Sequence, residues 1–196
     1  MATKAGPVRI GVFIPAETQL LDLACVDVLA MMSKQYLSAI TELPRATVDA
    51  APSVEVVYVT SAAAALFVTL TAGMTVRATH DLSHADVQPG RLDVLLVPGP
   101  DPSSTFEKDV LDFLRGHYEN PGTDVLSVCT GILLCGAAGI IEGKRVCGPR
   151  GMQDVLRKRF PGARFEGEKY RWLQDGNLWT SGTYTPTMHS ALINTP

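Results

Sequence analysis

Residues 124–134 read Asp-Val-Leu-Ser-Val-Cys-Thr-Gly-Ile-Leu-Leu, and they combine a strand pattern, a tight turn and a helix pattern. The apolar residues before Cys129 predict a buried strand, and the apolar run Ile132–Ile141 predicts a helix of small residues. A reactive side chain held at the sharp turn between a strand and a helix is the arrangement of a nucleophile elbow. Free N–H groups and partial positive charge at the helix start favour a thiolate at Cys129, although free cysteines are also often buried structural residues.

The same alternation of strand and helix patterns extends in both directions from this turn. Strands are predicted at Val8–Ile14, Val54–Val59 and Leu92–Val97. Helices are predicted at Leu20–Met32, Thr105–Tyr118 and Met152–Arg159. Buried strands that alternate with helices predict an α/β fold with a doubly wound, mostly parallel sheet flanked by helices. There is no repeat and no obvious linker, so we expect one domain over residues 1–196.

Turn-forming residues predict smaller features between these elements. Ala72-Gly73 lies between two apolar runs and predicts a hairpin over Phe67–Arg77. A second hairpin is expected around Asp175-Gly176-Asn177, with Trp172 and Trp179 packing on it. Residues 36–52 contain two prolines and are interpreted as connecting structure.

Composition excludes several classes of protein. Lysine plus arginine is 17 and aspartate plus glutamate is 20, so the net charge of −3 disfavours nucleic-acid binding. Polar and glycine residues interrupt the apolar stretches, and we expect neither a membrane span nor an N-terminal signal peptide. The four cysteines form no CxxC pair, which indicates reduced thiols in a cytoplasmic protein. Of these, Cys25 and Cys135 are interpreted as packing residues.

Acidic residues near the first strand are candidate partners for Cys129. In a parallel sheet the active site lies outside the carboxyl ends of the strands. Glu17, Asp22 and the loop Pro98–Pro102 all follow predicted strands. A thiol nucleophile needs a nearby group to accept or donate its proton. Spacing does not decide between Glu17 and Asp22, and Asp22 also fits an ordinary acid in a first helical turn.

The histidines give weaker signals. His80 and His84 are spaced as two ligands on one helix face, with Asp81 and Asp86 nearby, but Thr79, Ser83 and Pro89 favour a loop, and we expect no metal. His117 is predicted at a solvated helix end. His189 could face the catalytic region, although no local pattern requires this.

Six segments together resemble the DJ-1/PfpI superfamily, which has a class I glutamine amidotransferase-like, flavodoxin-like fold. The segments are 10–13 (IGVF), 19–23 (QLLDL), 92–99 (LDVLLVPG), 128–131 (VCTG), 137–144 (AAGIIEGK) and 175–182 (DGNLWTSG). The most similar branch is the isonitrile hydratase-like proteins. The resemblance implies a homodimer that needs no cofactor and acts on a small-molecule substrate.

The resemblance also implies roles for individual residues. Cys129 matches the nucleophile, Asp22 the acid beside it, and Thr130 the residue whose N–H and hydroxyl bind a developing anion. Gly99 matches a loop that supplies a further backbone donor. We expect the remaining lining of the site to come from Glu17, Pro100, Arg150 and Gly182.

These residues predict a cysteine-dependent hydratase or lyase, with hydration of an isocyanide to an N-substituted formamide as the expected reaction. The alternatives are a glyoxalase or other aldehyde-handling enzyme, and a non-catalytic member that senses oxidants or binds a ligand. The sequence departs from the family pattern at four places. Pro100 replaces a second glycine, Gly148-Pro149-Arg150 lacks the histidine that a glyoxalase would use, His189 replaces an aspartate, and the last helix is expected to be missing.

Overall fold

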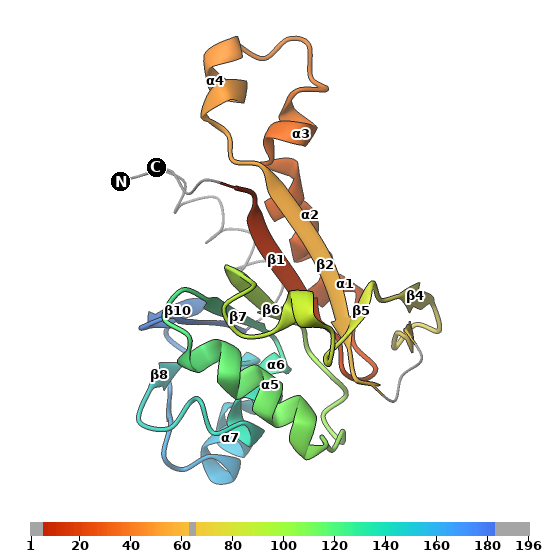
Figure 1. Ribbon diagram of the computed structural model, residues 1–196. Coiled ribbons are helices and arrows are strands. Elements are labelled where there is room, and N and C mark those ends of the chain that lie inside the picture. The colour runs from red at the N-terminus through yellow and green to blue at the C-terminus, as the bar shows by residue number, and fades with distance from the viewer. Residues whose placement is uncertain (1–5, 63–65, 183–196) are drawn as a thin grey trace.

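Seven strands lie side by side in one sheet of the computed structural model, which describes residues 6–62 and 66–182 (Figure 1). In spatial order they are β10 (Trp172–Asp175), β11 (Leu178–Ser181), β7 (Asp124–Val128), β6 (Val94–Val97), β1 (Val8–Phe13), β2 (Val54–Thr60) and β5 (His80–Asp81). All neighbours pair in parallel except β10 and β11, which form the predicted hairpin. The predicted α/β class with a mostly parallel sheet is confirmed.

Side chains of the central strands point alternately to two faces, and each face carries its own core. On one face, Phe13, Leu95 and Val97 pack with residues of α5 (Lys108–Glu119) and α6 (Gly131–Ala137). On the other face, Val12, Ile14 and Leu96 pack with residues of α1 (Leu20–Leu23), α2 (Cys25–Met31) and β3 (Phe67–Thr69). Figure 1 shows α5 in front of the sheet and α2 running along β1 and β2. Burial on both faces explains why these strands are mostly apolar and do not alternate with polar residues.

The segments between the central strands differ in part from the predictions. The predicted helix at 20–32 is divided at Ala24 into α1 and α2. Residues 36–52, expected to be connecting structure, contain the end of α3 (Lys34–Leu37) and all of α4 (Arg45–Ala50). The side chain of Ser33 caps α3, and Pro44 immediately precedes the first residue of α4, where a missing N–H costs little. Figure 1 shows α3 and α4 beyond the amino end of β2.

Two small ribbons and two 3₁₀ helices complete the described chain. The predicted hairpin near Gly73 is present as β3 paired with β4 (Thr75–Arg77), and β8 (Arg145–Val146) pairs with β9 (Arg164–Phe165). The 3₁₀ helices are η2 (Ala85–Val87) and η3 (Arg150–Met152), and η3 leads into α7 (Gln153–Arg159). Trp172 and Trp179 stack on the second hairpin, with ring centroids 5.8 Å apart. Within the described ranges, no helix is long and apolar enough to cross a membrane.

His117 lies in the core, and the prediction of a solvated position was wrong. The side chain is fully buried, and its Nε2 atom lies 2.9 Å from the carbonyl oxygen of Val87. Its ring packs against Phe113, one turn earlier on the same face of α5. The sequence shows His117 near the polar end of a helix, which predicts exposure. In the structure the segment at η2, including Val87, covers that end of α5. The segment expected to lack a last helix, like His189, lies outside the described residues.

Candidate active site

Cys129 sits at the carboxyl end of β7 in a strained backbone conformation. Its φ angle is 55°, in the left-handed region that residues other than glycine rarely adopt. Its N–H donates to the carbonyl oxygen of Ser181 at 3.1 Å, which ties the turn to β11. At Gly131, a Cβ atom would collide with the carbonyl oxygen of Val97, so only glycine lets the start of α6 approach β6 this closely. The predicted elbow geometry is therefore present.

Asp22 lies beside Cys129, and the structure thereby chooses between the two candidate acids. Asp22 is 1% exposed, and its carboxylate lies close enough to the Cys129 thiol that each group shifts the pKa of the other. Glu17, by contrast, is exposed in the loop before α1. Asp22 reaches the turn because α1 begins directly after the loop that follows β1, at the same edge of the sheet. The thiol and the carboxylate form a buried pair.

Burial and mutual repulsion set the protonation of this pair. Loss of solvation raises the pKa of Asp22 to about 6. Interactions with the Gly99 N–H and with Cys129 favour the ionised form and lower this pKa, but by less than burial raises it. Loss of solvation and the adjacent Asp22 charge raise the pKa of Cys129 to about 11, although the Thr130 N–H opposes this shift. The expectation that the helix start favours a thiolate is therefore corrected. Near neutral pH the pair is therefore a neutral thiol beside an ionised carboxylate.

The loop Gly99-Pro100 holds the acid and the residue after the cysteine. The Gly99 N–H donates to Oδ2 of Asp22 at 2.9 Å, and the Pro100 carbonyl accepts the Thr130 hydroxyl at 2.8 Å. A Cβ atom at Gly99 would overlap both the Asp22 carboxylate and the Thr130 hydroxyl. Here the Gly99 N–H positions Asp22, and the backbone N–H of Thr130 is the donor that faces the sulfur.

Thr18 is a further part of the site that sequence reasoning missed. It is buried, and its hydroxyl donates to the Gly99 carbonyl at 2.6 Å, beside a bridge between Thr18 and Pro100. These bonds attach the loop after β1 to the loop after β6. A single threonine in a polar loop carries no sequence signal for this role, because the partner lies 81 residues away.

Gly182 and Arg150 were also predicted to line the site beside Cys129 and Asp22, and the structure places them in different surroundings. Gly182 is buried directly after Ser181, whose carbonyl binds Cys129, and a Cβ atom there would come within 2.8 Å of the Gly148 carbonyl. Arg150 is exposed in η3, where its positive charge acts on Cys147 and opposes the rise of that thiol's pKa. Gly182 therefore packs next to the Cys129 turn, whereas Arg150 lies in η3 and acts on Cys147.

A cysteine elbow paired with a buried acid at the carboxyl edge of a parallel sheet defines a class of α/β proteins with a nucleophile-elbow site. The family model of the DJ-1/PfpI family matches residues 32–194, and the chain belongs to this family. The predicted superfamily is confirmed.

Individual relatives agree with this assignment. The isonitrile hydratase of Pseudomonas putida is 38% identical over 103 residues, which are 52% of this chain and 43% of that protein. The match therefore spans less than half of the relative's length, and it supports the predicted isonitrile hydratase-like branch. Drosophila melanogaster DJ-1beta superposes with a TM-score of 0.72 at 15% identity, covering 96% of this chain and 88% of its own. Schizosaccharomyces pombe DJ-1 gives 0.70 at 13% identity, covering 96% and 92%. These two likenesses show the shared fold.

Proposed function

We propose that the chain is a cofactor-independent enzyme that hydrates isocyanides to N-substituted formamides, with Cys129 as nucleophile and Asp22 as acid and base. The observation that carries the proposal is the buried Asp22 carboxylate, which the Gly99 N–H holds beside the Cys129 thiol at the elbow. The similarity to an isonitrile hydratase supports the choice of substrate class.

In the first half of the proposed reaction, Asp22 takes the proton from the Cys129 thiol as sulfur attacks the terminal isocyanide carbon. A carboxylate with a pKa of about 6 is ionised at neutral pH and accepts this proton once the substrate approaches. The new carbon–sulfur bond leaves a lone pair on carbon. Asp22 returns the proton to that carbon, and a thioimidate on Cys129 results. The proton thus moves from sulfur to carbon, and no oxidant or reductant is needed.

In the second half, water adds to the carbon of the thioimidate. The nitrogen gains a proton, and the carbon then carries sulfur, hydroxyl, hydrogen and nitrogen. Collapse to the formamide breaks the carbon–sulfur bond, and Cys129 regains its proton through Asp22. The Thr130 N–H beside the sulfur stabilises the thiolate as it leaves. In both halves of the reaction, Asp22 accepts and returns the proton of Cys129.

Two alternatives are less well supported by this geometry. A redox sensor uses a low-pKa thiolate that reacts with peroxide, whereas burial and Asp22 raise the pKa of Cys129. A glyoxalase would need a histidine near the thiol, and the segment Gly148-Pro149-Arg150 provides none. The hydratase requires only a neutral thiol and a carboxylate in contact.

Turnover of an alkyl isocyanide, followed by formamide production, tests the proposal. Turnover should fall to the uncatalysed rate in Cys129→Ala and Cys129→Ser, while Cys147→Ala removes a buried thiol elsewhere and should keep it. Methylglyoxal consumption and peroxide oxidation, read by intact mass, are run in parallel. Wild-type protein that ignores isocyanides but consumes methylglyoxal, or oxidises selectively at Cys129, would replace the proposal with the corresponding alternative.

The homodimer belongs to the same proposal. Leu20, Leu21 and Met31 are 43%, 54% and 48% exposed, which is unusual for residues of this size. Beside them lies a mostly apolar groove of about 240 Å³ between α1, α2, β2 and β4. A second copy packing over this surface would cover it. Sedimentation should give twice the chain mass for the wild type, and Leu21→Glu should give the chain mass alone.

A further inference from the structure

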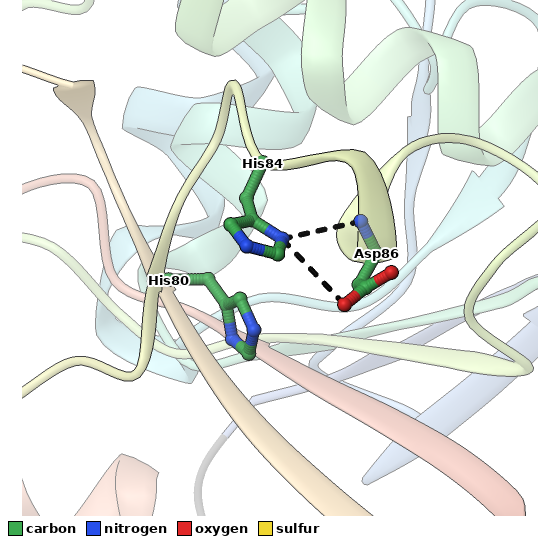
Figure 2. A group of neighbouring side chains, drawn as sticks. All are labelled: His80, His84 and Asp86. Atoms are coloured by element: carbon green, nitrogen blue, oxygen red, sulfur yellow. Dashed lines mark hydrogen bonds and ion pairs between the residues drawn. The ribbon is translucent and has the colours of Figure 1, made fainter.

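His80, His84 and Asp86 lie together near the edge of the sheet, away from the residues proposed for catalysis. A possible ligand atom from each residue lies within 4.8 Å of those from the other two. The segment is not a helix, as predicted: His80 begins β5, and His84 precedes η2. The turn between them nevertheless brings the two rings to a centroid distance of 4.5 Å. Figure 2 shows the three side chains projecting toward a common space.

A hydrogen bond with Thr79 engages one ring nitrogen of His80. The Thr79 hydroxyl lies 3.0 Å from the Tyr58 carbonyl and accepts the Tyr58 N–H at 2.9 Å. The same hydroxyl lies 2.8 Å from Nδ1 of His80, so Thr79 engages this nitrogen in either tautomer. In the tautomer that carries the proton on Nδ1, the ring donates to Thr79 and Nε2 holds a free lone pair. Metal-binding histidines typically have their second nitrogen oriented in this way.

His84 and Asp86 form the second half of the cluster. Nδ1 of His84 lies 3.8 Å from the carboxylate oxygen Oδ2 of Asp86 and accepts the Asp86 N–H at 3.2 Å. Two ligands of a tetrahedral zinc ion, each at about 2.0–2.1 Å from the metal, are about 3.3 Å apart. The separation of 3.8 Å is close to that of a chelating pair, and a metal bound at Nδ1 of His84 would replace the Asp86 N–H as the partner of its lone pair. Both side chains are exposed, so a small rotation closes the difference.

We propose that His80, His84 and Asp86 bind one divalent transition-metal ion of the zinc class. Two imidazole nitrogens and one carboxylate oxygen are a ligand set that Zn²⁺ accepts, whereas Ca²⁺ and Mg²⁺ prefer oxygen ligands. Because His84 and Asp86 are exposed, water completes the coordination. Asp81, whose carboxylate is held by Ser83, adds a second negative charge beside the two rings.

The ion would add a link between β5 and η2. His80 belongs to the short edge strand β5, while Asp86 belongs to η2. The backbone carbonyl of Asp86 accepts a hydrogen bond from the guanidinium of Arg9, on β1, at 2.9 Å. A metal that bridges β5 and η2 would therefore link the edge strand β5 to the inner strand β1 through Asp86 and Arg9. The bound ion stabilises the folded chain because the unfolded chain does not hold the three ligands together.

Zinc titration of the metal-free chain tests the site, with Zn²⁺ alone as the probe. All proteins carry Cys129→Ser, so that the elbow thiol does not bind the ion. We expect one Zn²⁺ per chain, with affinity at least about 10-fold weaker in His80→Ala, His84→Ala and Asp86→Asn. Asp49→Asn, another exposed acid, is the matched control and should bind as the parent does. Equal affinity in the parent and the His80→Ala and His84→Ala variants would overturn the proposal, as would the absence of binding.

Two further measurements separate ligation from a general effect on the surface. Nitrogen-15 resonances of His80 should show zinc at Nε2 with Nδ1 still protonated. Thr79→Val removes the acceptor for that proton and should weaken zinc binding by about 10–100-fold. Zinc should also raise the melting temperature of the parent but not that of His84→Ala. Ligation of His80 through Nδ1, or equal stabilisation of both proteins by zinc, would contradict the assigned geometry.

Discussion

The backbone N–H of Gly99 donates a 2.9 Å hydrogen bond to Oδ2 of Asp22. This bond joins the loop after β6 to the first helix and holds a buried carboxylate beside Cys129. An ionised carboxylate has about four acceptor positions, so Asp22 still has room to accept the thiol proton. The acid is thus fixed by the backbone and leaves its remaining acceptors for chemistry.

Gly99→Ala should disable the site. The new methyl group would overlap the Asp22 carboxylate and the Thr130 hydroxyl, so at least one of them must move. Overpacking of this kind costs about 1–3 kcal/mol of unfolding free energy. We expect a lower melting temperature together with loss of isocyanide turnover. Gly151→Ala is the control, because a Cβ atom there meets nothing within 4 Å. Equal behaviour of the two variants would mean that Gly99 does not position the acid.

Asp22→Asn should remove the acidic limb of the pH–rate profile. Asp22 acts as base only when ionised, so wild-type kcat/KM should rise with pH through a pKa of about 6 and then level off. The amide cannot take the thiol proton, and turnover should fall by at least about 100-fold. The measurement is kcat/KM for an alkyl isocyanide from about pH 5 to 9. An unchanged limb in the variant would assign it to another group.

The same substitution should make Cys129 easier to alkylate. The Asp22 charge and its hydrogen bond both raise the pKa of the thiol, so Asp22→Asn should lower that pKa, while burial keeps it above the ordinary value. Peptide mass spectrometry after iodoacetamide at about pH 8–9 measures the effect. Cys135, in the core, is the internal control and should be unaffected. Slower alkylation of Cys129 in the variant would show that Asp22 favours the thiolate.

Asp22→Asn should also stabilise the fold at neutral and alkaline pH. Because the folded-state pKa of Asp22 is raised, ionisation disfavours the folded state, and stability is lost as pH rises from about 3.8 to about 6. The shift corresponds to a contribution on the order of 3 kcal/mol. Chemical unfolding should therefore show the variant more stable at about pH 8 and nearly equal to wild type below about pH 4. A stability difference that does not depend on pH would contradict this origin.

Thr130→Val should weaken the fold through the Pro100 carbonyl. This carbonyl accepts the Thr130 hydroxyl in a buried setting, and valine leaves it without that partner. An unsatisfied buried acceptor costs about 1–3 kcal/mol. Thr130→Ser keeps the hydroxyl and should retain most of the stability and the turnover. Denaturant unfolding of both variants measures the difference. Equal losses in the two variants would contradict the assignment of the stability to the hydrogen bond between the Thr130 hydroxyl and the Pro100 carbonyl.

Local patterns were sufficient to predict the central strands, the elbow and the class of the sheet, but not the edge strand β5, where a loop was expected. Val8–Phe13, Val94–Val97 and Asp124–Val128 are mostly apolar because both faces of the sheet are covered, and such runs are visible in the chain itself. The patterns failed where burial came from distant segments. His117 occupies a polar-looking helix end, yet it is enclosed and bonded to Val87, 30 residues away.

The position of Cys129 at a strand–helix turn in a mostly parallel sheet follows from the sequence, because strand and helix periodicity and the Cys-Thr-Gly step are local properties. Tertiary contacts bring Asp22 rather than Glu17 to the thiol, set the protonation of that pair, and gather two imidazoles and a carboxylate in the His80–Asp86 turn. These outcomes depend on which loops meet at the edge of the sheet and on how much water they exclude. Both are properties of contacts between residues far apart in the chain, and no local pattern encodes them.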